Sequence, residues 1–195
     1  PGAQVGFVNS VSEFAPHRTR DFLDSTYAGL FDYLWNQVWL EAPTTGWISL
    51  PCGGRDQFVP DLKDSCDWWG VNYYTNQRVD SRHPRGAVMA LEGERVSQMG
   101  WTWQPDGLYR ALQRYSVLNR PMYVTENGIG TLDDLERVRF VAEHLRMVSL
   151  AIEQGMDIRG YLYWSLIDNF EWACGFRPRF GLVHVDYESL KRTVK

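Results

Sequence analysis

The stretch MYVTENGIG, residues Met122 to Gly130, runs an apolar strand-like segment directly into a carboxylate. The segment reaches Glu126 and is then interrupted by Asn127 and Gly128, two residue types that are typical of turns. A strand end is a poor place for an unpaired charge, because burying a charge without a partner is costly. We therefore predict that Glu126 meets a ligand; the alternative is that it only caps the segment that follows.

Outward from this stretch, strand and helix patterns alternate. Strands are predicted at Val5–Ser10, Asp67–Thr75, Met122–Asn127 and Gly160–Phe170. Helices are predicted over Asp21–Leu40, over Pro105–Ser116, and from Asp133 and Asp134 to Gly155. Residues 42–60 are rich in Pro and Gly and are expected to be irregular, and residues 76–104 show little periodicity. The last strand is apolar on both faces, as expected for a parallel strand buried under helices.

The alternation predicts an α/β fold with a parallel sheet covered by helices. A doubly wound sheet and a (β/α)8 barrel both fit the pattern, but no G-x-G-x-x-G follows the first strand, which weakens a dinucleotide-binding interpretation. Polar residues fall at the carboxyl ends of the predicted strands, where barrel enzymes place their active sites. These residues are Asn9, Asn72, Tyr74, Glu126 and the group from Asp168 to Glu171.

Glu126 is the leading candidate for chemistry, because a carboxylate on a rigid strand end can act as nucleophile, base or metal ligand. No H-E-x-x-H motif, EF-hand loop or histidine cluster accompanies it, so we predict no metal and no cofactor. Asn72 and Tyr74 are plausible donors that hold the carboxylate. His144, inside the third predicted helix, is expected to be structural.

A second cluster follows the fourth predicted strand. Trp164, Asp168, Asn169, Glu171 and Trp172 fall within nine positions. An indole face packs on the apolar face of a pyranose, and a carboxylate accepts hydrogen bonds from neighbouring hydroxyls, so the cluster suits a sugar. The alternative is a pair of core tryptophans beside a solvated glutamate. The aromatic content of 14% fits either an aromatic core or a sugar-stacking site.

Length and composition limit the remaining possibilities. A chain of 195 residues is long enough for one domain, predicted to span residues 1–195. The net charge is −4 and the basic residues are scattered, so we expect no nucleic-acid partner. No apolar run is long enough to span a membrane, and no signal peptide is visible. Cys52, Cys66 and Cys174 are odd in number and lack C-x-x-C spacing, which favours a reducing compartment, expected to be the cytoplasm.

Several long motifs resemble family 1 of the glycoside hydrolases, the β-glucosidase and β-galactosidase group. The resemblance runs from about residue 4 to the C-terminus. The motifs are WWGVNYYT (residues 68–75), MGWTWQPDGLYRAL (99–112), VTENG (124–128), AIEQGMDIRGYLYWSL (151–166) and YWSLIDNFEWACGFRPRFGLVHVDY (163–187).

This resemblance implies a (β/α)8 TIM barrel that hydrolyses β-glycosides with retention of configuration. By motif position, Glu126 corresponds to the catalytic nucleophile, Tyr74 to the residue that hydrogen-bonds it, and Asn72 to a close neighbour. Trp164 corresponds to the platform under the glycone ring. The resemblance further implies that Glu171 and Trp172 bind its hydroxyls and that Phe180 lines an apolar wall.

The chain departs from the family pattern in one important respect. A retaining glycosidase needs a second carboxyl group as acid/base, and the family's Thr-x-Asn-Glu-Pro motif that carries it is absent. The chain therefore resembles the C-terminal half of the barrel, about strands five to eight. It is expected to be a piece completed by an N-terminal half-barrel in the same gene product or another chain, a self-associating barrel-like dimer, or a non-catalytic sugar-binding half-barrel.

The resemblance also bears on the substrate. Family members that act on 6-phosphorylated sugars carry a Ser where this chain has Glu171, with a nearby Lys and Tyr that hold the phosphate. Here Glu171 is present and Phe180 stands where that Tyr would be. We therefore expect an unphosphorylated β-linked glucoside, galactoside or related saccharide. Arg177 and Arg179 would oppose this expectation if either turned inward, although Arg179 is expected to brace its loop.

Overall fold

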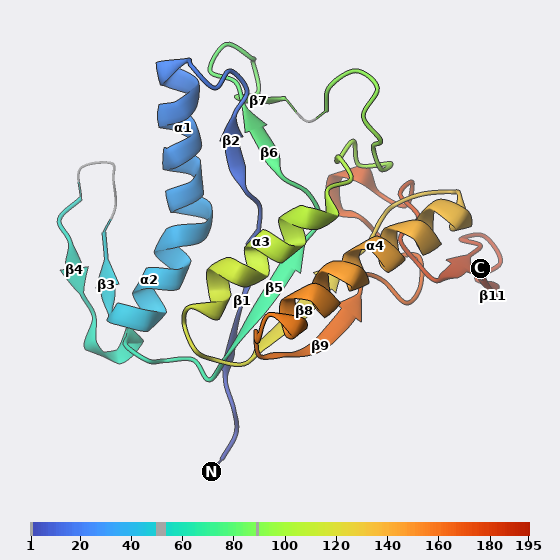
Figure 1. Ribbon diagram of the computed structural model, residues 1–195. Helices are drawn as coiled ribbons and strands as arrows, with labels where there is room; N and C mark the ends of the chain where they lie inside the picture. The colour runs from blue at the N-terminus through green and yellow to red at the C-terminus, as the bar shows by residue number, and fades with distance from the viewer. Residues whose placement is uncertain (1, 50–53, 89) are drawn as a thin grey trace.

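The computed structural model describes residues 2–49, 54–88 and 90–195 and contains one parallel sheet covered by helices. The sheet has the strand order β1-β5-β8-β9 (Figure 1). Its strands are β1 (Gly6–Val11), β5 (Trp68–Tyr73), β8 (Met122–Asn127) and β9 (Ile158–Tyr163). All three pairings are parallel, as the alternation of strands and helices predicted.

Helices connect successive strands of this sheet, and α3 and α4 lie side by side across one of its faces (Figure 1). The helical segments are α1 (Phe22–Asp32), the π-helical η1 (Tyr33–Gln37), α2 (Val38–Thr45), α3 (Pro105–Ser116) and α4 (Asp134–Glu153). Asp21 and Asp133 cap α1 and α4, because each carboxylate accepts hydrogen bonds from two free backbone amides of the first turn. The predicted helix starts are therefore confirmed.

The first helical segment extends further than its sequence suggested. It was predicted to end at Leu40, with irregular structure from Ala42, but α2 runs to Thr45 with Pro43 inside it. Gly46 ends the helix instead: it adopts a left-handed φ of 82° and its N–H bonds the carbonyl of Ala42. A glycine in this conformation, and not the proline, therefore sets the boundary.

Short strands and turns also occur where irregular structure was expected. One small sheet joins β2 (Phe14–Pro16), β6 (Gln77–Val79) and β7 (Ala87–Val88), and a hairpin joins β3 (Trp47–Ile48) to β4 (Gln57–Phe58). Near the C-terminus, β10 (Val183–Val185) pairs with β11 (Arg192–Val194). Single 3-10 turns occur at η2 (Pro60–Leu62) and η3 (Trp172–Cys174).

The fourth predicted strand, Gly160–Phe170, is wrong at both ends. β9 begins at Ile158 and ends at Tyr163. Trp164 N still donates to the Asn127 carbonyl of β8, but the next residue bonds to the segment after residue 179: Ser165 N donates to the Phe180 carbonyl and Leu182 N donates to the Ser165 carbonyl. The expectation that both faces of this strand are buried is also wrong. Leu162 is 53% exposed, whereas its neighbour Tyr161 packs against the core, so only one face of β9 is covered.

Alternation along the strands separates the two faces of the sheet. Trp69, Val71 and Tyr73 of β5 point toward α3 and α4 and are buried there with Met122 and Val124 of β8. Leu108 and Leu112 of α3 complete this core from the helical side. The opposite face carries Asn72, and Tyr74 follows it on the same side beyond the strand end. Polar side chains therefore gather on the face that the helices do not cover.

His144 of α4 belongs to the helical side of this core. Its ring is fully buried and stacks on Phe140 with centroids 3.8 Å apart, and Nδ1 lies 2.8 Å from the Phe140 carbonyl oxygen. Within the described residues Nε2 has no hydrogen-bond partner. Burial lowers the pKa of His144 from 6.5 to about 4. The expected structural role agrees with this position.

We expect His144 to make the fold sensitive to acid. Its pKa is lower in the folded state, so the unfolded chain binds the proton first and stability falls between pH 6.5 and about 4. The full loss is about 3 kcal/mol. The check is denaturant unfolding at pH 7, 6 and 5: His144→Leu should flatten the pH dependence, whereas exposed His83→Gln should leave it unchanged. An equally steep dependence in His144→Leu would contradict the prediction.

Candidate active site

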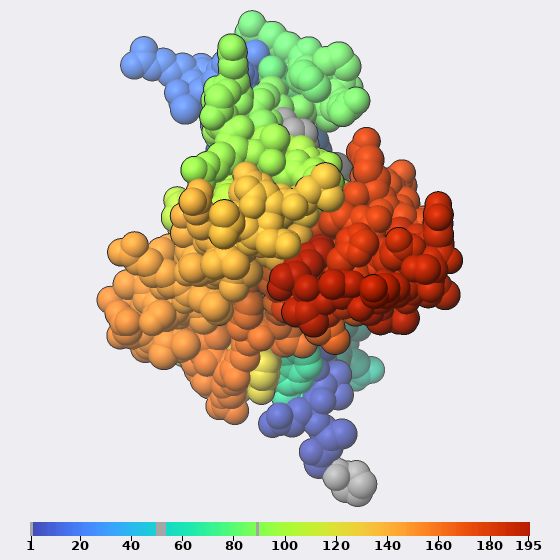
Figure 2. All heavy atoms as spheres, turned by 90° about the vertical axis from the view of Figure 1, so that its right-hand side faces the viewer, coloured from blue at the N-terminus to red at the C-terminus, as the bar shows by residue number. Residues whose placement is uncertain are grey.

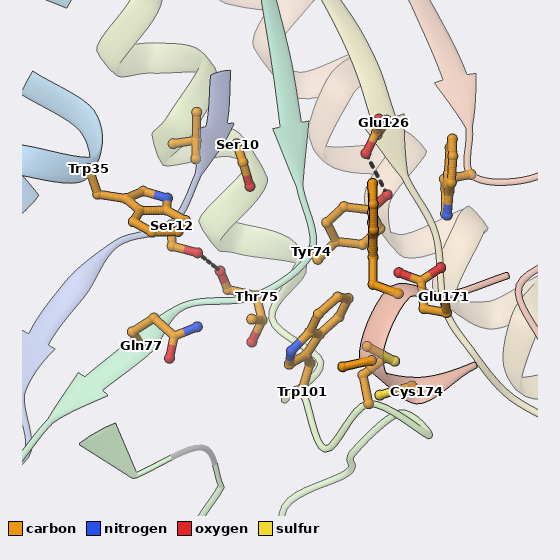
Figure 3. A pocket seen from close by; sticks show the side chains of 15 residues that line it. Ser10, Ser12, Trp35, Tyr74, Thr75, Gln77, Trp101, Glu126, Glu171 and Cys174 are labelled. Atoms are coloured by element: carbon orange, nitrogen blue, oxygen red, sulfur yellow. Dashed lines mark hydrogen bonds between the residues drawn. The ribbon is translucent and has the colours of Figure 1, made fainter. Parts of the chain in front are cut away.

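A cavity of about 530 Å³ opens at the carboxyl ends of β1, β5 and β8 (Figure 3). Five of the predicted site residues line it: Tyr74, Glu126, Trp164, Glu171 and Trp172. They come from three separate parts of the chain, and the parallel sheet brings them together because its carboxyl ends share one edge. Figure 3 shows Glu126, Tyr74 and Glu171 toward one side of the cavity and Trp35 on the other.

A β-bulge aims Glu126 into this cavity. Val71 pairs with Val124, but the next residue of β5, Asn72, pairs with Glu126, so Thr125 is the extra residue. Simple alternation from the buried Val124 would have turned Glu126 back into the core. The bulge shifts the pattern by one residue, so Glu126 lines the cavity and Asn127 is buried in its place.

Tyr74 holds the carboxylate of Glu126. Its phenol donates a hydrogen bond to Glu126 Oε2 at 2.8 Å (Figure 3). Burial, and then the neighbouring negative charges of Glu126 and Glu171, raise the pKa of Tyr74 well above its usual value of 10. Tyr74 therefore stays protonated, as a donor to a carboxylate must.

Asn72 lies beside this pair without lining the cavity. Its Oδ1 accepts a hydrogen bond of 2.6 Å from the hydroxyl of Thr125, the extra residue of the bulge. Asn72 thus fastens the bulge that turns Glu126. Asn9, which was expected at a strand end, lies within β1 and donates to the Tyr115 hydroxyl at 3.1 Å. It faces the helical layer, so its expected place at the site is wrong.

Phe180 does not lie on the cavity wall, where it was predicted. It is fully buried one layer behind that wall, with its ring edge-on to Tyr74 at 6.2 Å and tilted against Trp101 at 6.4 Å. Trp101 lines the cavity and packs on Tyr74 at 5.1 Å. Trp101 was not among the predicted site residues, because the segment before α3 has no periodicity that shows which way its tryptophans point.

Glu171 and Trp172 share a short turn at the cavity rim but differ in environment. Glu171 is 8% exposed and accepts a hydrogen bond of 2.9 Å from Asn169 Nδ2. Trp172 is 82% exposed and has a positive φ of 46°, which is uncommon for a residue with a side chain. The turn therefore carries a carboxylate held by a hydrogen bond and an indole exposed to solvent. Trp164, at the end of β9, lines the same cavity.

Asp168 anchors the segment that leads into the turn of Glu171 and Trp172. Its buried carboxylate accepts hydrogen bonds from Arg179 Nη1 at 3.1 Å, Lys195 Nζ at 3.0 Å and the amide of Gly181 at 3.0 Å. Burial by itself would raise the pKa of Asp168, but Lys195 and the backbone amides of Val185 and Gly181 hold it below its usual value. Arg179 also stacks over the ring of Tyr187 at 4.3 Å. Arg179 thus braces the loop, as expected, and does not line the cavity.

Residues 2–49, 54–88 and 90–195 contain no group of three acidic, His or Cys side chains able to hold a metal ion. Cys66 and Cys174 are free thiols, and Cys52 lies outside the described residues. No helix in the described ranges is long and apolar enough to span a membrane.

The fold and the cavity agree with what the sequence comparisons show. The chain belongs to family 1 of the glycosyl hydrolases, whose family model matches residues 17–195. It is similar to a β-galactosidase of Saccharolobus solfataricus, with 38% identity over 95% of this chain and 40% of the relative. It is also similar to a β-glucosidase of an Agrobacterium species, with 40% identity over 69% of this chain and 33% of the relative.

Solved structures give the same result. A β-glycosidase from Pyrococcus horikoshii matches with a TM-score of 0.88 and 41% identity over 98% of this chain and 45% of that one. The Thermotoga maritima β-glucosidase solved with castanospermine matches with a TM-score of 0.82 and 28% identity over 98% of this chain and 48% of that one. The chain therefore spans less than half the length of these relatives. The prediction of half a (β/α)8 barrel is confirmed.

Proposed function

We propose that this chain supplies the nucleophile half of a retaining β-glycosidase. The observation that supports the proposal most is the Tyr74–Glu126 hydrogen bond inside a cavity that also holds Trp164 and Glu171. A carboxylate oriented by a neutral phenol, next to an indole and a second carboxylate, can attack a sugar that the indole and the second carboxylate bind. The names of the relatives, β-galactosidase and β-glucosidase, support the same reaction class.

In the proposed reaction Glu126 attacks the anomeric carbon of the bound sugar. A bond forms between that carbon and a carboxylate oxygen while the bond to the aglycone oxygen breaks, which gives a covalent glycosyl-enzyme. Tyr74 keeps the attacking carboxylate in place. Trp164 supports the ring from its apolar face, and Glu171 accepts hydrogen bonds from its hydroxyls. Water then attacks the same carbon and releases the sugar with its configuration retained.

The departing oxygen needs a proton from a second carboxyl group, about 5–5.5 Å from the nucleophile in a retaining enzyme. Glu171 shares the cavity, but its hydrogen bond from Asn169 suits sugar binding. We therefore assign the acid/base to a complementary N-terminal half-barrel, in the same gene product or in another chain. In the described part of the sheet, β1 and β9 each have one unpaired edge, where further parallel strands would close the barrel. Below, "complete enzyme" means this chain together with that half.

The test is to label the nucleophile of the complete enzyme. A 2-deoxy-2-fluoro β-glucoside with a dinitrophenyl leaving group should form a stable glycosyl ester on one residue, and peptide mapping should find it on Glu126. A label on another residue would contradict the assignment, and no label would favour a non-catalytic sugar-binding half-barrel. The isolated chain serves as the comparison and should not turn over an unactivated disaccharide, because general acid–base catalysis contributes about 10²–10⁴-fold.

The substrate class is testable through Glu171. A buried carboxylate at the rim repels a phosphate dianion, because like charges are weakly screened in a partly desolvated pocket. We expect the complete enzyme to prefer nitrophenyl β-glucoside over its 6-phosphate by about 10²-fold in kcat/KM. Glu171→Ser should shrink this preference, and Glu188→Ser, on an exposed turn, should not. A wild-type preference for the phosphate ester would refute the proposed substrate class.

A further inference from the structure

One buried arginine joins two separate segments behind the cavity wall. Arg137 lies in the first turn of α4 and is 3% exposed. The helix dipole disfavours a cation at this end of a helix. Among the residues that the structure describes it forms one ion pair, from Nε to the half-exposed carboxylate of Asp134 at 3.2 Å. Neither the helix nor this ion pair accounts for a buried guanidinium, so the reason must be sought in its other contacts.

Those contacts are three backbone carbonyls and one side-chain hydroxyl, that of Tyr163, to which Nη1 donates at 3.2 Å. Arg137 Nη2 donates to the Thr131 carbonyl at 2.7 Å, and Nη1 donates to the Ile129 carbonyl at 2.9 Å and to the Phe180 carbonyl at 3.2 Å. Ile129 and Thr131 belong to the segment that leaves β8 just after Glu126. Figure 2 shows the C-terminal part of the chain, coloured red, packed against the yellow segment around the start of α4. The guanidinium ties these two parts together.

Both parts bear directly on the nucleophile. The segment from Gly128 to Thr131 continues the strand that carries Glu126, so its position sets where that strand ends. The Phe180 ring packs behind Tyr74, and the Tyr74 phenol donates to Glu126. A second donor, the Tyr163 hydroxyl, bonds the same Phe180 carbonyl at 2.9 Å. Arg137 therefore anchors the backbone that follows Glu126. It also anchors Phe180, which packs behind Tyr74, the hydrogen-bond donor to Glu126.

We infer that Arg137 is a positioning residue for the nucleophile, an inference that rests on the proposed function. It lies outside the residues that line the cavity and acts through carbonyls of residues 129, 131 and 180. The planar fork of a guanidinium spans acceptors from two segments at once. A lysine ammonium keeps the charge but cannot reproduce that geometry. Arg137→Lys therefore tests the hydrogen-bonding geometry of the guanidinium separately from its charge.

The experiment measures inactivation of the complete enzyme by dinitrophenyl 2-deoxy-2-fluoro-β-glucoside, which reports attack by Glu126 alone. Arg137→Lys should lower the inactivation rate constant by about 10- to 10²-fold per folded molecule, because small displacements of reacting groups are costly. The inhibitor's binding constant should change less than about threefold, since the sugar-binding side chains are untouched. Arg139→Lys, exposed on the same helix, is the matched control and should behave as wild type.

A double-mutant cycle with Tyr74→Phe tests the route of the effect. If Arg137 acts through Phe180 and Tyr74, Arg137→Lys should cost at least about fivefold less in the Tyr74→Phe background than in the wild type. A fully additive loss would overturn the inference. A wild-type inactivation rate in folded Arg137→Lys, or a loss that only lowers the folded fraction, would overturn it as well.

If Arg137→Lys does not fold, the variant Tyr163→Phe tests the inference instead. It removes the other donor to the Phe180 carbonyl, together with the hydroxyl that Arg137 Nη1 contacts at 3.2 Å, and keeps the guanidinium and its three carbonyl acceptors. A slower inactivation with an unchanged Tm supports the shared anchor, and an unchanged rate overturns it. Failure of the proposed function looks different, because the wild-type enzyme itself would then not be labelled on Glu126. That result would remove the inference together with its premise.

Discussion

Replacing Glu126 with glycine in the complete enzyme is expected to lower kcat/KM by about 10⁴- to 10⁶-fold, because no covalent glycosyl-enzyme can then form. The fold should survive. Glu126 lies at a strand end beside an open cavity, and within the described part of the chain Tyr74 is its one side-chain hydrogen-bond partner. Glu188→Gly, on an exposed turn, is the matched control and should keep wild-type activity.

Chemical rescue makes this prediction specific for a nucleophile. In Glu126→Gly the space left by the carboxylate admits azide, which can attack the anomeric carbon from the same side. With a dinitrophenyl β-glucoside, the phenolate leaves without needing a proton and the product is the α-glycosyl azide. A β-azide would place the lost carboxylate on the acid/base side. Full activity without azide would show that Glu126 takes no part in the reaction.

Gly128→Ala is expected to have the next largest effect. A Cβ at this position would overlap the carbonyl oxygen of Trp164 and lie 2.8 Å from its carbonyl carbon. Both are backbone atoms, so the ends of β8 and β9 would have to separate. Glu126 and Trp164 sit on those two ends. We expect kcat/KM to fall by about 10²-fold and the free energy of unfolding to drop by about 1–3 kcal/mol.

Gly29→Ala is the matched control for this substitution. A Cβ at Gly29 would meet no heavy atom within 4 Å, and the residue lies inside α1. This control should leave activity unchanged and stabilise the fold by up to about 1 kcal/mol, because alanine is the better helix former. Steady-state kinetics and denaturant unfolding of both variants provide the check. Wild-type kinetics in Gly128→Ala would mean that the spacing of the two strand ends does not matter for catalysis.

Local sequence patterns predicted a large part of the secondary structure of this protein. Apolar runs placed β1, β5 and β8, and Asp133 and Gly155 marked the two ends of α4. These features are predictable because strand and helix periodicity and the carboxylates that cap helices act over a few residues. The collection of Tyr74, Glu126 and Glu171 at one edge also followed from the sequence, since parallel strands end on the same side. The single domain over residues 1–195 and the cytoplasmic location stay predictions.

Tertiary contacts decided the rest. The bulge at Thr125, which turns Glu126 outward, depends on pairing with β5, and nothing near Thr125 in the sequence marks it. The end of β9 at Tyr163 depends on the segment after residue 179, which bonds Ser165 in place of β8. Phe180 lies behind the wall and Trp101 on it because of how three distant segments pack. These features depend on contacts between segments that are far apart in the sequence, so local patterns do not predict them.

The Asn-Gly pair after Glu126 illustrates both what the sequence predicts and what only the tertiary structure decides. From the sequence alone, the pair predicts that the strand ends at Asn127, since both residue types favour turns. In the structure Asn127 still belongs to β8 and is buried: its amide donates to the Tyr73 carbonyl and its oxygen accepts from Tyr161. Gly128 is needed because the Trp164 backbone approaches it closely. The sequence determined that a carboxylate ends a buried strand here, and only the packing of neighbouring strands decided why asparagine and glycine must follow it.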